Sequence, residues 1–329
     1  MKLDVTVAKI NKEYGENTIG FASELKFTKV ERLSSGSLFL DWALGQNEED
    51  KTAGWPVGRI VELFGPESAG KSLIASKTIA EAQKLGYDCL YIDCENSYDK
   101  DFAKTLGVDN TKLLLSRESR GEKVLEIICN AMASPKLRVV VLDSLASMIP
   151  KPEMEKSLDD TQPMAAMARL MSIGLRKLTV FNKHGTLIII INQLRVNPGA
   201  RFGNPEYTPG GRALKFYASI RVDVRKGDWI FDTNDKKKRV GHIVKFNVIK
   251  NKTDIPQKNG YFKFLYTGEI DQVDQLISLG LLNKTIIRKG AYYYVGEERF
   301  LGRDGLEVSL KKDEKLFIEA KKIVFGEEK

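Results

Sequence analysis

The sequence is poor in the residues that build metal sites and disulfide frameworks. Its 329 residues include three cysteines and two histidines. Cys89, Cys94 and Cys129 lack the spacing of a metal-ligand motif, and so sparse a set excludes a disulfide scaffold and a zinc finger. Because His184 and His242 are isolated in sequence, we interpret both as structural and expect no Ser-His-Asp or zinc-hydrolase site.

Long apolar segments are also absent. The longest run, residues 187–191, is far shorter than the roughly 20 residues that span a bilayer, which excludes a membrane helix. Residues 1–10 mix charged and apolar side chains and lack the continuous apolar stretch of a secretory signal. We therefore expect a cytoplasmic protein with no membrane partner.

The charge is basic. The chain has 52 Lys and Arg against 44 Asp and Glu, a formal net charge of +8. This excess favours a polyanionic partner such as a nucleic acid. A solvated basic surface without such a partner is the alternative that composition leaves open.

Apolar runs alternate with segments of helical length from residue 59 onward. The runs are 59–65, 88–94, 112–116, 139–144 and 187–193. The main helical segments are 71–85, 122–132 and 164–182. Strands that are apolar on both faces and alternate with helices predict an α/β fold with a mostly parallel central sheet covered by helices.

The flanking segments differ from this pattern. Residues 1–33 predict a short helix over about 5–13 and a polar connector, which we interpret as an attached arm. After residue 211, segments 213–226 and 240–252 alternate partially between apolar and polar, which predicts antiparallel strands that extend the sheet around an exposed turn. The pattern from residue 271 onward predicts a helix at 271–280, then strands, and a last helix near 310–324.

We therefore predict three parts. Residues 1–33 form an N-terminal oligomerisation arm, residues 34–269 form the α/β core, and residues 270–329 form a small C-terminal α+β domain. The sequence contains no internal repeat and no low-complexity tract.

The strongest motif occupies residues 65–72. It follows a predicted strand and opens a predicted helix, which is the context that confirms the pattern G-x-x-x-x-G-K-[ST]. In such a loop, backbone N–H groups surround phosphate oxygens, Lys71 neutralises the β- and γ-phosphates and the Ser72 hydroxyl binds Mg²⁺. The predicted nucleotide-phosphate site comprises Gly65, Pro66, Glu67, Ser68, Ala69, Gly70, Lys71 and Ser72.

Two other predicted strands end in carboxylates. Asp143 ends the strand at 139–143, where phosphate-loop proteins hold the Mg²⁺ shell, although a helix cap is an alternative. Asp93 and Glu95 end the strand that follows the phosphate loop. Glu95 is the candidate to orient and deprotonate an attacking water, with Asp93 supporting it, and a solvated loop acid is the alternative.

Gln193 lies between a buried strand and a loop of about 18 residues without periodicity. Loops of this length inside compact domains are usually functional. Arg195, Arg201 and several glycines suit this loop to wrap a phosphate backbone, while Gln193 at its root is a candidate sensor of the γ-phosphate. An ordinary surface loop is the alternative.

A second candidate loop spans residues 150–163. It follows the strand that ends at Asp143, and its charges are mixed. A basic helix face that carries Arg169 and Arg176 comes after it. The mixed charge makes this loop a weaker candidate for a nucleic-acid surface than the loop after Gln193.

Taken together and in this order, the motifs resemble those of the RecA-type recombinases, including bacterial and phage-encoded members. The likeness extends from about residue 34 to the last helix and includes GRIVELFGPESAGKS, YIDCENSYD, LMSIGLRKL, FGNPEYTPGGRALKFYAS and IKNK. It implies a RecA-type P-loop ATPase that forms helical filaments on single-stranded DNA. The filament would search duplex DNA for homology and exchange strands, with DNA-stimulated ATP hydrolysis.

The resemblance also implies residue roles. Lys71 and Ser72 would contact the phosphates and Mg²⁺, Glu95 would be the catalytic base, Asp143 would lie in the metal shell and Gln193 would link nucleotide to DNA. Residues implied at the adenine are Asp99, Phe102 and Tyr266. Residues implied at the subunit contact are Phe216, Lys250 and Lys252, the two lysines reaching the neighbouring protomer's nucleotide. Residues implied at the DNA are Arg169, Arg176, Arg195, Arg201, Phe202, Gly203, Asn204, Gly210, Gly211 and Arg212.

The implied ligands and partners are ATP and Mg²⁺, single- and double-stranded DNA, and further copies of the chain. The family's mediator proteins and a self-cleaving repressor extend this set. The sequence departs from the family pattern in a longer connection at 46–54, in Pro198 within the DNA loop, and in lacking a long acidic C-terminal tail. A RecA-fold ATPase regulator or motor without strand exchange is the alternative function.

Overall fold

The computed structural model describes residues 3–16, 18–23, 30–157, 165–197 and 205–326. It divides into two compact units, residues 1–30 and residues 31–329.

The smaller unit contains one helix, α1 (Leu3–Tyr14), at the position that the sequence predicts. Asn11 closes the turn that follows it, because its side chain donates to Ile19 O at 2.8 Å and accepts from Ile19 N at 2.9 Å. None of the residues of α1 is buried. Isolated helices of about 12 residues are marginal in water, so packing against another surface would stabilise α1.

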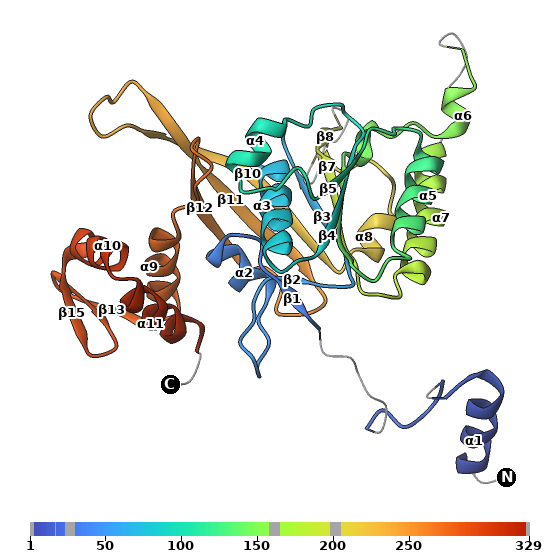
Figure 1. The fold of residues 1–329 in the computed structure, drawn as a ribbon, viewed down its shortest axis with the longest axis horizontal. Coiled ribbons are helices and arrows are strands. Elements are labelled where there is room, and N and C mark those ends of the chain that lie inside the picture. The colour runs from blue at the N-terminus through green and yellow to red at the C-terminus, as the bar shows by residue number, and fades with distance from the viewer. Residues whose placement is uncertain (1–2, 17, 24–29, 158–164, 198–204, 327–329) are drawn as a thin grey trace. The chain divides into compact units, whose positions relative to one another are not determined.

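The larger unit is built on an eight-stranded sheet (Figure 1). The strand order is β12-β11-β10-β3-β7-β6-β4-β5. All neighbours from β10 to β5 are parallel, whereas β11 and β12 are antiparallel additions at one edge. The strands are β3 (Ile60–Gly65), β4 (Asp88–Asp93), β5 (Leu113–Ser116), β6 (Leu137–Asp143), β7 (Leu187–Gln193), β10 (Ile220–Phe231), β11 (Arg239–Asn251) and β12 (Asn259–Leu265). The predicted mostly parallel sheet is confirmed.

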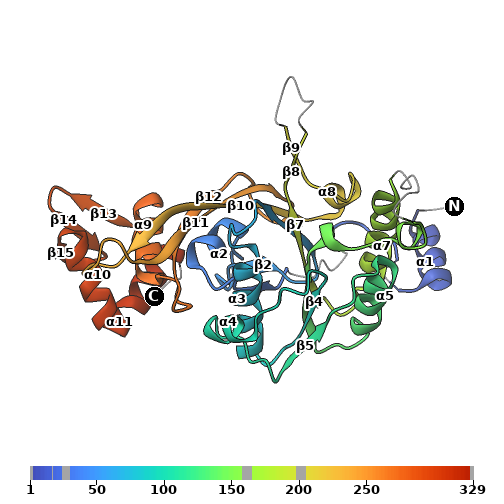
Figure 2. The same cartoon turned by 90° about the horizontal axis from the view of Figure 1, so that it is seen from above.

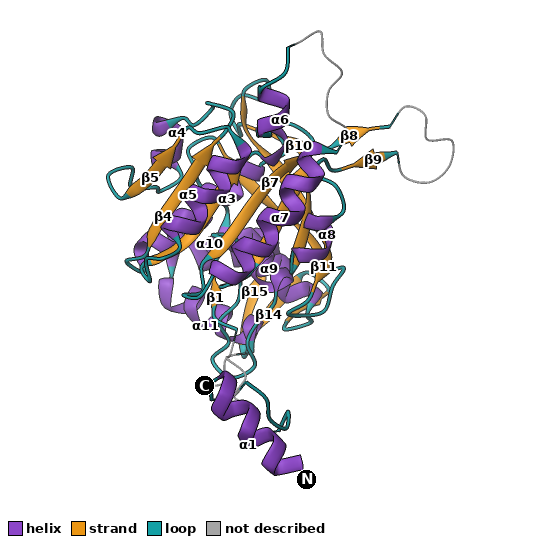
Figure 3. Cartoon of the chain, turned by 90° about the vertical axis from the view of Figure 1, so that its right-hand side faces the viewer, coloured by secondary structure: helices purple, strands orange, loops and turns teal. Residues whose placement is uncertain are grey.

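Both faces of this sheet are buried, because successive residues of a strand point to opposite sides. In β7, Ile189 and Ile191 belong to one hydrophobic core, and Ile188 and Ile190 belong to the other. Helices α2 (Leu38–Leu44) and α3 (Lys71–Lys84) contribute to the first core. Helices α5 (Gly121–Ala131), α7 (Ala166–Phe181) and α8 (Ala213–Tyr217) contribute to the second, and Figure 3 shows α5 and α7 across the sheet.

The prediction for segment 213–226 was partly wrong. Residues 213–217 form α8, and β10 then runs parallel to β3 instead of extending an antiparallel edge. Leu214 and Ala218, four residues apart, are both buried in the second core, and this helical spacing outweighs the apparent alternation. The antiparallel pairing of β10 with β11 and the exposed turn between them are as predicted.

The C-terminal part contains α9 (Gln272–Leu282), a three-stranded antiparallel sheet and two further helices. The sheet consists of β13 (Ile286–Lys289), β14 (Tyr292–Val295) and β15 (Glu298–Leu301). The single last helix that the sequence predicts is instead two, α10 (Gly302–Lys312) and α11 (Glu314–Phe325). Asp313 divides them because its side chain accepts from Lys315 N and Leu316 N and so caps α11.

Short elements complete the unit. They are β1 (Arg32–Leu33), β2 (Trp55–Pro56), α4 (Lys100–Thr105), the 3₁₀ turn η1 (Leu145–Ser147), α6 (Lys151–Met154), β8 (Arg195–Val196) and β9 (Glu206–Tyr207). The connection at 46–54 is closed by a bridge between Gln46 and Ala53. The helices that the structure describes include none that is both long and apolar enough to cross a membrane.

Candidate active site at the carboxyl edge of the sheet

The phosphate loop connects β3 to α3, as predicted. A Cβ atom at Gly65 would lie 2.0 Å from Val224 O of the neighbouring strand, so only glycine fits there. Lys71 Nζ curls back and donates to Gly65 O at 3.1 Å and Pro66 O at 2.6 Å. Burial lowers the pKa of Lys71, while nearby Asp143 and other carboxylates oppose that shift. The loop thus holds a buried cation beside its own backbone.

The strand register gathers the predicted residues at one edge. Gly65 lies opposite Gln193 in the β3–β7 pair, and Asp93 lies opposite Asp143 in the β4–β6 pair. Carboxyl ends of parallel strands meet at the same edge of a sheet, where α/β proteins bind ligands. Residues separated by more than a hundred positions in sequence therefore surround one site.

Asp143 forms the centre of a buried hydrogen-bond group. Its Oδ2 accepts from Ser72 Oγ at 2.7 Å and from the Tyr91 hydroxyl at 2.6 Å. Burial raises the pKa of Asp143, and the two hydrogen bonds act against that shift. Burial and the neighbouring Asp143 also raise the pKa of Tyr91 well above its usual value, so Tyr91 stays a phenol that donates to the carboxylate.

The donor set of Ser72 and Asp143 fits a magnesium ion. Mg²⁺ prefers oxygen ligands and is commonly bound by one or two carboxylates together with substrate phosphates and water. A hydroxyl and a carboxylate oxygen 2.7 Å apart at the start of α3 supply the protein share of such a shell. The described residues contain no cluster of three or more His, Cys, Asp or Glu side chains that could hold a metal alone.

Glu95 lies in the turn after β4 and is exposed. Its Oε1 accepts from Ser144 Oγ at 2.5 Å, Ser147 Oγ at 3.0 Å and Gln193 Nε2 at 2.9 Å. Three donors on one oxygen orient the carboxylate, and the side chain stays exposed to water at the edge of the site. The structure therefore joins Glu95 and Gln193 directly.

Asp93 contacts the backbone of the turn that carries Glu95 and not Glu95 itself. Its carboxylate accepts from Ser97 N and Tyr98 N, both at 3.0 Å, and so closes the turn that carries Glu95. Tyr91, Ser144 and Ser147 also belong to this site and were not expected from the sequence. The signal for Tyr91 was its place two residues before Asp93, on the same strand face, and that for the serines was their position directly after Asp143.

The residues implied at the adenine lie near one another. The Asp99 side chain accepts from Asp101 N and Phe102 N and caps α4. The rings of Phe102 and Tyr266 both contact Phe264, with centroid distances of 6.3 and 6.2 Å. Phe102 and Tyr266 are 40% and 46% exposed, which leaves apolar ring surface available to a ligand.

Phe216, Lys250 and Lys252 lie at the opposite edge of the sheet from the phosphate loop. Lys250 Nζ donates to Lys215 O and Phe216 O, and Lys252 Nζ donates to Phe216 O. The Phe216 ring is 69% exposed. Burial, together with the charges of Lys252 and Arg221, lowers the pKa of Lys250 to about 8. The hydrogen bonds of both lysines go to the backbone of α8, and among the described residues none goes to the phosphate loop.

The loop after Gln193 begins and ends as a two-stranded ribbon, β8–β9, that projects from the sheet (Figure 2). Arg195 is exposed on β8 and lies opposite Tyr207. Gly210 and Gly211, at the exit of the ribbon, have φ values of +91° and +77°, and Arg212 beside them is exposed. The predicted residues Arg201, Phe202, Gly203 and Asn204, and also Pro198, lie outside the described residues.

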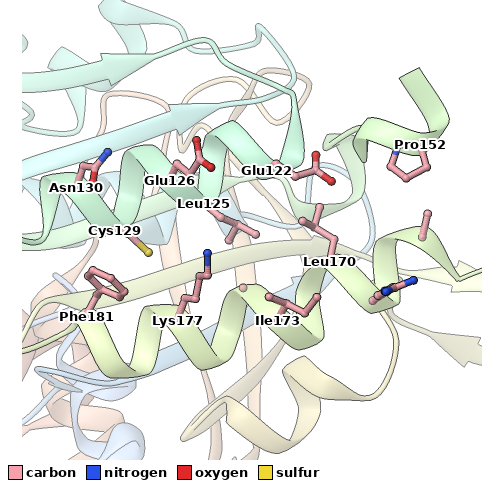
Figure 4. Close-up of a pocket in the computed structure, with 13 residues that line it drawn as sticks. Glu122, Leu125, Glu126, Cys129, Asn130, Pro152, Leu170, Ile173, Lys177 and Phe181 are labelled. Atoms are coloured by element: carbon pink, nitrogen blue, oxygen red, sulfur yellow. The ribbon is translucent and has the colours of Figure 1, made fainter. Parts of the chain in front are cut away.

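Arg169 and Arg176 are exposed on α7. Arg169 lines a cavity of about 460 Å³ between α5 and α7 (Figure 4). Glu122 and Glu126 lie on the α5 side of this cavity, and Lys177 extends from α7. None of the phosphate-site residues among the described ones lines it. Of the second candidate loop, 150–157 is described and includes α6, and 158–163 lies outside the described residues.

The comparisons with known proteins agree with this geometry. A family model described as the RecA N-terminal domain matches residues 1–271. The chain is 42% identical over 321 residues to the Protein RecA of Mesomycoplasma hyopneumoniae, with 97% of this chain and 92% of that protein covered. It is 42% identical over 306 residues to the Protein RecA of Cytophaga hutchinsonii, covering 92% of this chain and 84% of the relative.

A solved structure supports the fold alone. A crystal structure of the RadB recombinase aligns with a TM-score of 0.52 and 17% identity, covering 72% of this chain and 97% of that one. The family model and the two relatives support assignment to a family, whereas this distant neighbour supports only the fold. The chain therefore belongs to the RecA family, the nucleotide-binding ATPases of recombination, and is a RecA-type recombinase.

Proposed function

We propose that this protein is a DNA-dependent ATPase that assembles into helical filaments on single-stranded DNA and catalyses homology search and strand exchange. The single observation that carries the proposal is the hydrogen bond from Gln193 Nε2 to Glu95 Oε1 at 2.9 Å. Gln193 ends the strand beside Gly65 and begins the ribbon β8–β9, so one residue contacts both the hydrolytic site and the candidate DNA loop.

In this proposal each residue of the site has a defined task. Lys71 neutralises phosphate charge, and the loop amides of residues 65–72 bind phosphate oxygens. Glu95 takes a proton from the attacking water, held in position by Ser144, Ser147 and Gln193. A magnesium ion held through Ser72 and Asp143 would supply charge neutralisation between the phosphates.

The exposed residues at the opposite edge support assembly between copies. Phe216 is a large exposed aromatic, and two lysines are hydrogen-bonded to the backbone beside it. We propose that Phe216 packs against the next protomer and that Lys250 and Lys252 reach that protomer's nucleotide. Residues 1–33 would act as the oligomerisation arm, consistent with the unburied helix α1, and residues 270–329 as a C-terminal domain.

The DNA would lie along Arg195 and the glycine-rich exit of the ribbon, with Arg169, Arg176 and Arg212 as further contacts. Their phosphate contacts would make binding strongly salt-dependent. Mediator proteins and a self-cleaving repressor would be further partners of the filament. We expect the protein to act in the cytoplasm.

The test is ATP hydrolysis with and without single-stranded DNA, followed by D-loop formation with matched and mismatched duplex. We expect hydrolysis to rise with single-stranded DNA and D-loops to form only with matched duplex. Stimulated hydrolysis without D-loops would favour a RecA-fold regulator or motor instead. Lys71→Ala, which removes the phosphate-loop cation, is the control for both readouts.

A further inference from the structure

His242, on β11, is a buried histidine whose ring nitrogens are unsatisfied. It is 8% exposed, and neither Nδ1 nor Nε2 has a hydrogen-bond partner in the described part of the chain. A buried polar atom without a partner is uncommon in folded proteins, because it has lost its hydrogen bonds to water and gained none in return. A bound ligand could supply the missing partner.

The position of His242 connects it to the phosphate loop. Val244, two residues further along β11, contacts that loop, since a Cβ atom at Gly70 would lie 3.2 Å from Val244 Cγ2. Residues two apart in a strand share a face, and they are about 7 Å apart along it. His242 therefore lies on the face of β11 that meets the phosphate loop, one side-chain position before Val244.

Three rings surround His242, and one of them, Tyr266, belongs to the predicted base site. The imidazole contacts Phe264 at 5.6 Å, Tyr266 at 6.0 Å and Trp229 at 6.1 Å between centroids. Phe264 also contacts Phe102 at 6.3 Å. Phe102 and Tyr266 are the residues implied to flank the adenine, so the unsatisfied imidazole belongs to the same aromatic cluster.

The chemistry of the two groups is complementary. Burial and the charge of Lys226 lower the pKa of His242, which keeps the imidazole neutral at pH 7. A neutral imidazole has one N–H donor and one acceptor nitrogen. The edge of adenine offers the same two functions, an acceptor at N7 and donors on the 6-amino group.

We propose that His242 is a specificity-determining residue that hydrogen-bonds the edge of the purine base of the bound nucleotide. The proposal rests on the proposed function in one respect, namely that Phe102 and Tyr266 flank the base. It replaces our interpretation of His242 as a purely structural residue.

The experiment measures equilibrium binding of ATP and two analogues to the full-length protein without DNA. 7-deaza-ATP lacks the N7 acceptor, and purine riboside triphosphate lacks the 6-amino group. We expect the unmodified protein to bind at least one analogue roughly five- to tenfold more weakly than ATP, as for loss of one hydrogen bond. In His242→Phe, the affinity for ATP should fall by a similar factor. The preference for ATP over that analogue should disappear.

Two variants serve as controls. His184→Phe alters the other histidine, which is exposed, and should change neither affinity nor preference. His242→Leu also removes both ring nitrogens and replaces the Phe variant if the thermal midpoint of that variant falls. If the unmodified protein binds both analogues as tightly as ATP, or if His242→Phe keeps the parent's preference, the proposal is wrong.

Binding of dATP tests the alternative that His242 bonds to the ribose and not to the base. A lost bond to the ribose hydroxyl would appear as weaker binding of dATP than of ATP. A His242-dependent loss confined to dATP would overturn the assignment to the base. Failure of the proposed function has a separate signature. If Lys71→Ala binds all four triphosphates as the parent does, the phosphate-loop assignment fails, whatever His242 does.

Discussion

The two edges of the central sheet differ in the side-chain contacts that they make within one chain. At the carboxyl edge, side chains from four strands and the turns after them bond to one another, as in the contacts of Glu95 with Ser144 and Gln193. At the amino edge, Phe216 is exposed and Lys250 and Lys252 bond only to nearby backbone carbonyls among the described residues. The first edge is held together by hydrogen bonds within one copy, whereas the second presents an exposed Phe216, which we propose contacts another copy.

The largest effect is expected from Lys71→Ala at the carboxyl edge. The phosphates lose their main cation, so we expect nucleotide-dependent DNA binding to be abolished and ATP affinity to fall by more than about a hundredfold. Binding of a fluorescent ATP analogue measures this. Lys84→Ala removes an exposed lysine of the same helix and is the matched control. Normal ATPase activity in the Lys71 variant would contradict the assignment.

The next largest effect is expected from Glu95→Gln. We expect ATP binding and filaments to persist while hydrolysis falls by roughly 10² or more, because the site keeps its shape and loses its base. Steady-state phosphate release and electron microscopy measure the two properties. If binding and hydrolysis fell together, Glu95 would have a structural role instead.

Phe216→Ala tests the amino edge. An exposed aromatic that fills a neighbour's pocket is typically worth about 2 kcal/mol or more, so assembly should weaken while the fold of the dilute protein is kept. Light scattering reports assembly, and the thermal midpoint reports the fold. Leu85→Ala, an apolar residue of similar exposure at the end of α3, is the control. Unchanged filaments would show that the two edges do not differ as described.

Gln193→Ala tests communication between the nucleotide and the ribbon. Basal ATP affinity should remain, but most of the ATP-induced gain in single-strand affinity should disappear, a coupling of typically about 1–3 kcal/mol. The measurement is a thermodynamic square, with DNA and nucleotide affinities each measured with and without the other ligand at fixed salt. Val196→Ala on β8 is the control in the same ribbon. Parental coupling on both sides of the square would exclude Gln193 as the link.

The smallest effect concerns pH at the amino edge. The pKa of Lys250 is about 8, below the ordinary lysine value, so the side chain is charged below pH 8 and loses its charge as the pH rises. If that charge acts on the neighbouring nucleotide, DNA-stimulated hydrolysis should fall by a few-fold between pH 7 and 9. Lys250→Arg keeps its charge over this range and should flatten the profile. An identical profile in both proteins would argue against a role for this charge.

The parts of the fold that were predictable were those with a strong local pattern. The buried parallel strands and α3, α5 and α7 were predicted within a few residues, because their apolar periodicity is long and consistent. The five-residue helix α8 was missed, since the apolar pattern of so short a segment fits both the period of a helix and the period of a strand. The break at Asp313 was missed because the capping hydrogen bonds depend on the local backbone.

The site was predictable where a motif carries its own chemistry. The structure brings the loop at 65–72, Asp143 and Gln193, all singled out from the sequence, to one edge of the sheet. Ser144, Ser147 and Tyr91 were not singled out, because their roles depend on contacts across strands that are far apart in sequence. The surroundings of His242 were not predictable for the same reason, since isolation in sequence says nothing of the rings that surround it.

Strand β10 has a consequence for where the chain can tolerate insertions. Its 12 residues, roughly 40 Å of extended chain, start beside the edge that carries Phe216, pass Gly65 at Val224, and reach Trp229 beside His242. Between these points Arg225 holds the ribbon through two hydrogen bonds to Glu206, at 2.9 and 2.6 Å. One added residue in β10 would turn every later side chain to the other face. The length of this single strand therefore sets the spacing between Phe216, the phosphate loop, the ribbon and His242, whereas a change of length in the exposed turn at 232–238 would leave that spacing unchanged.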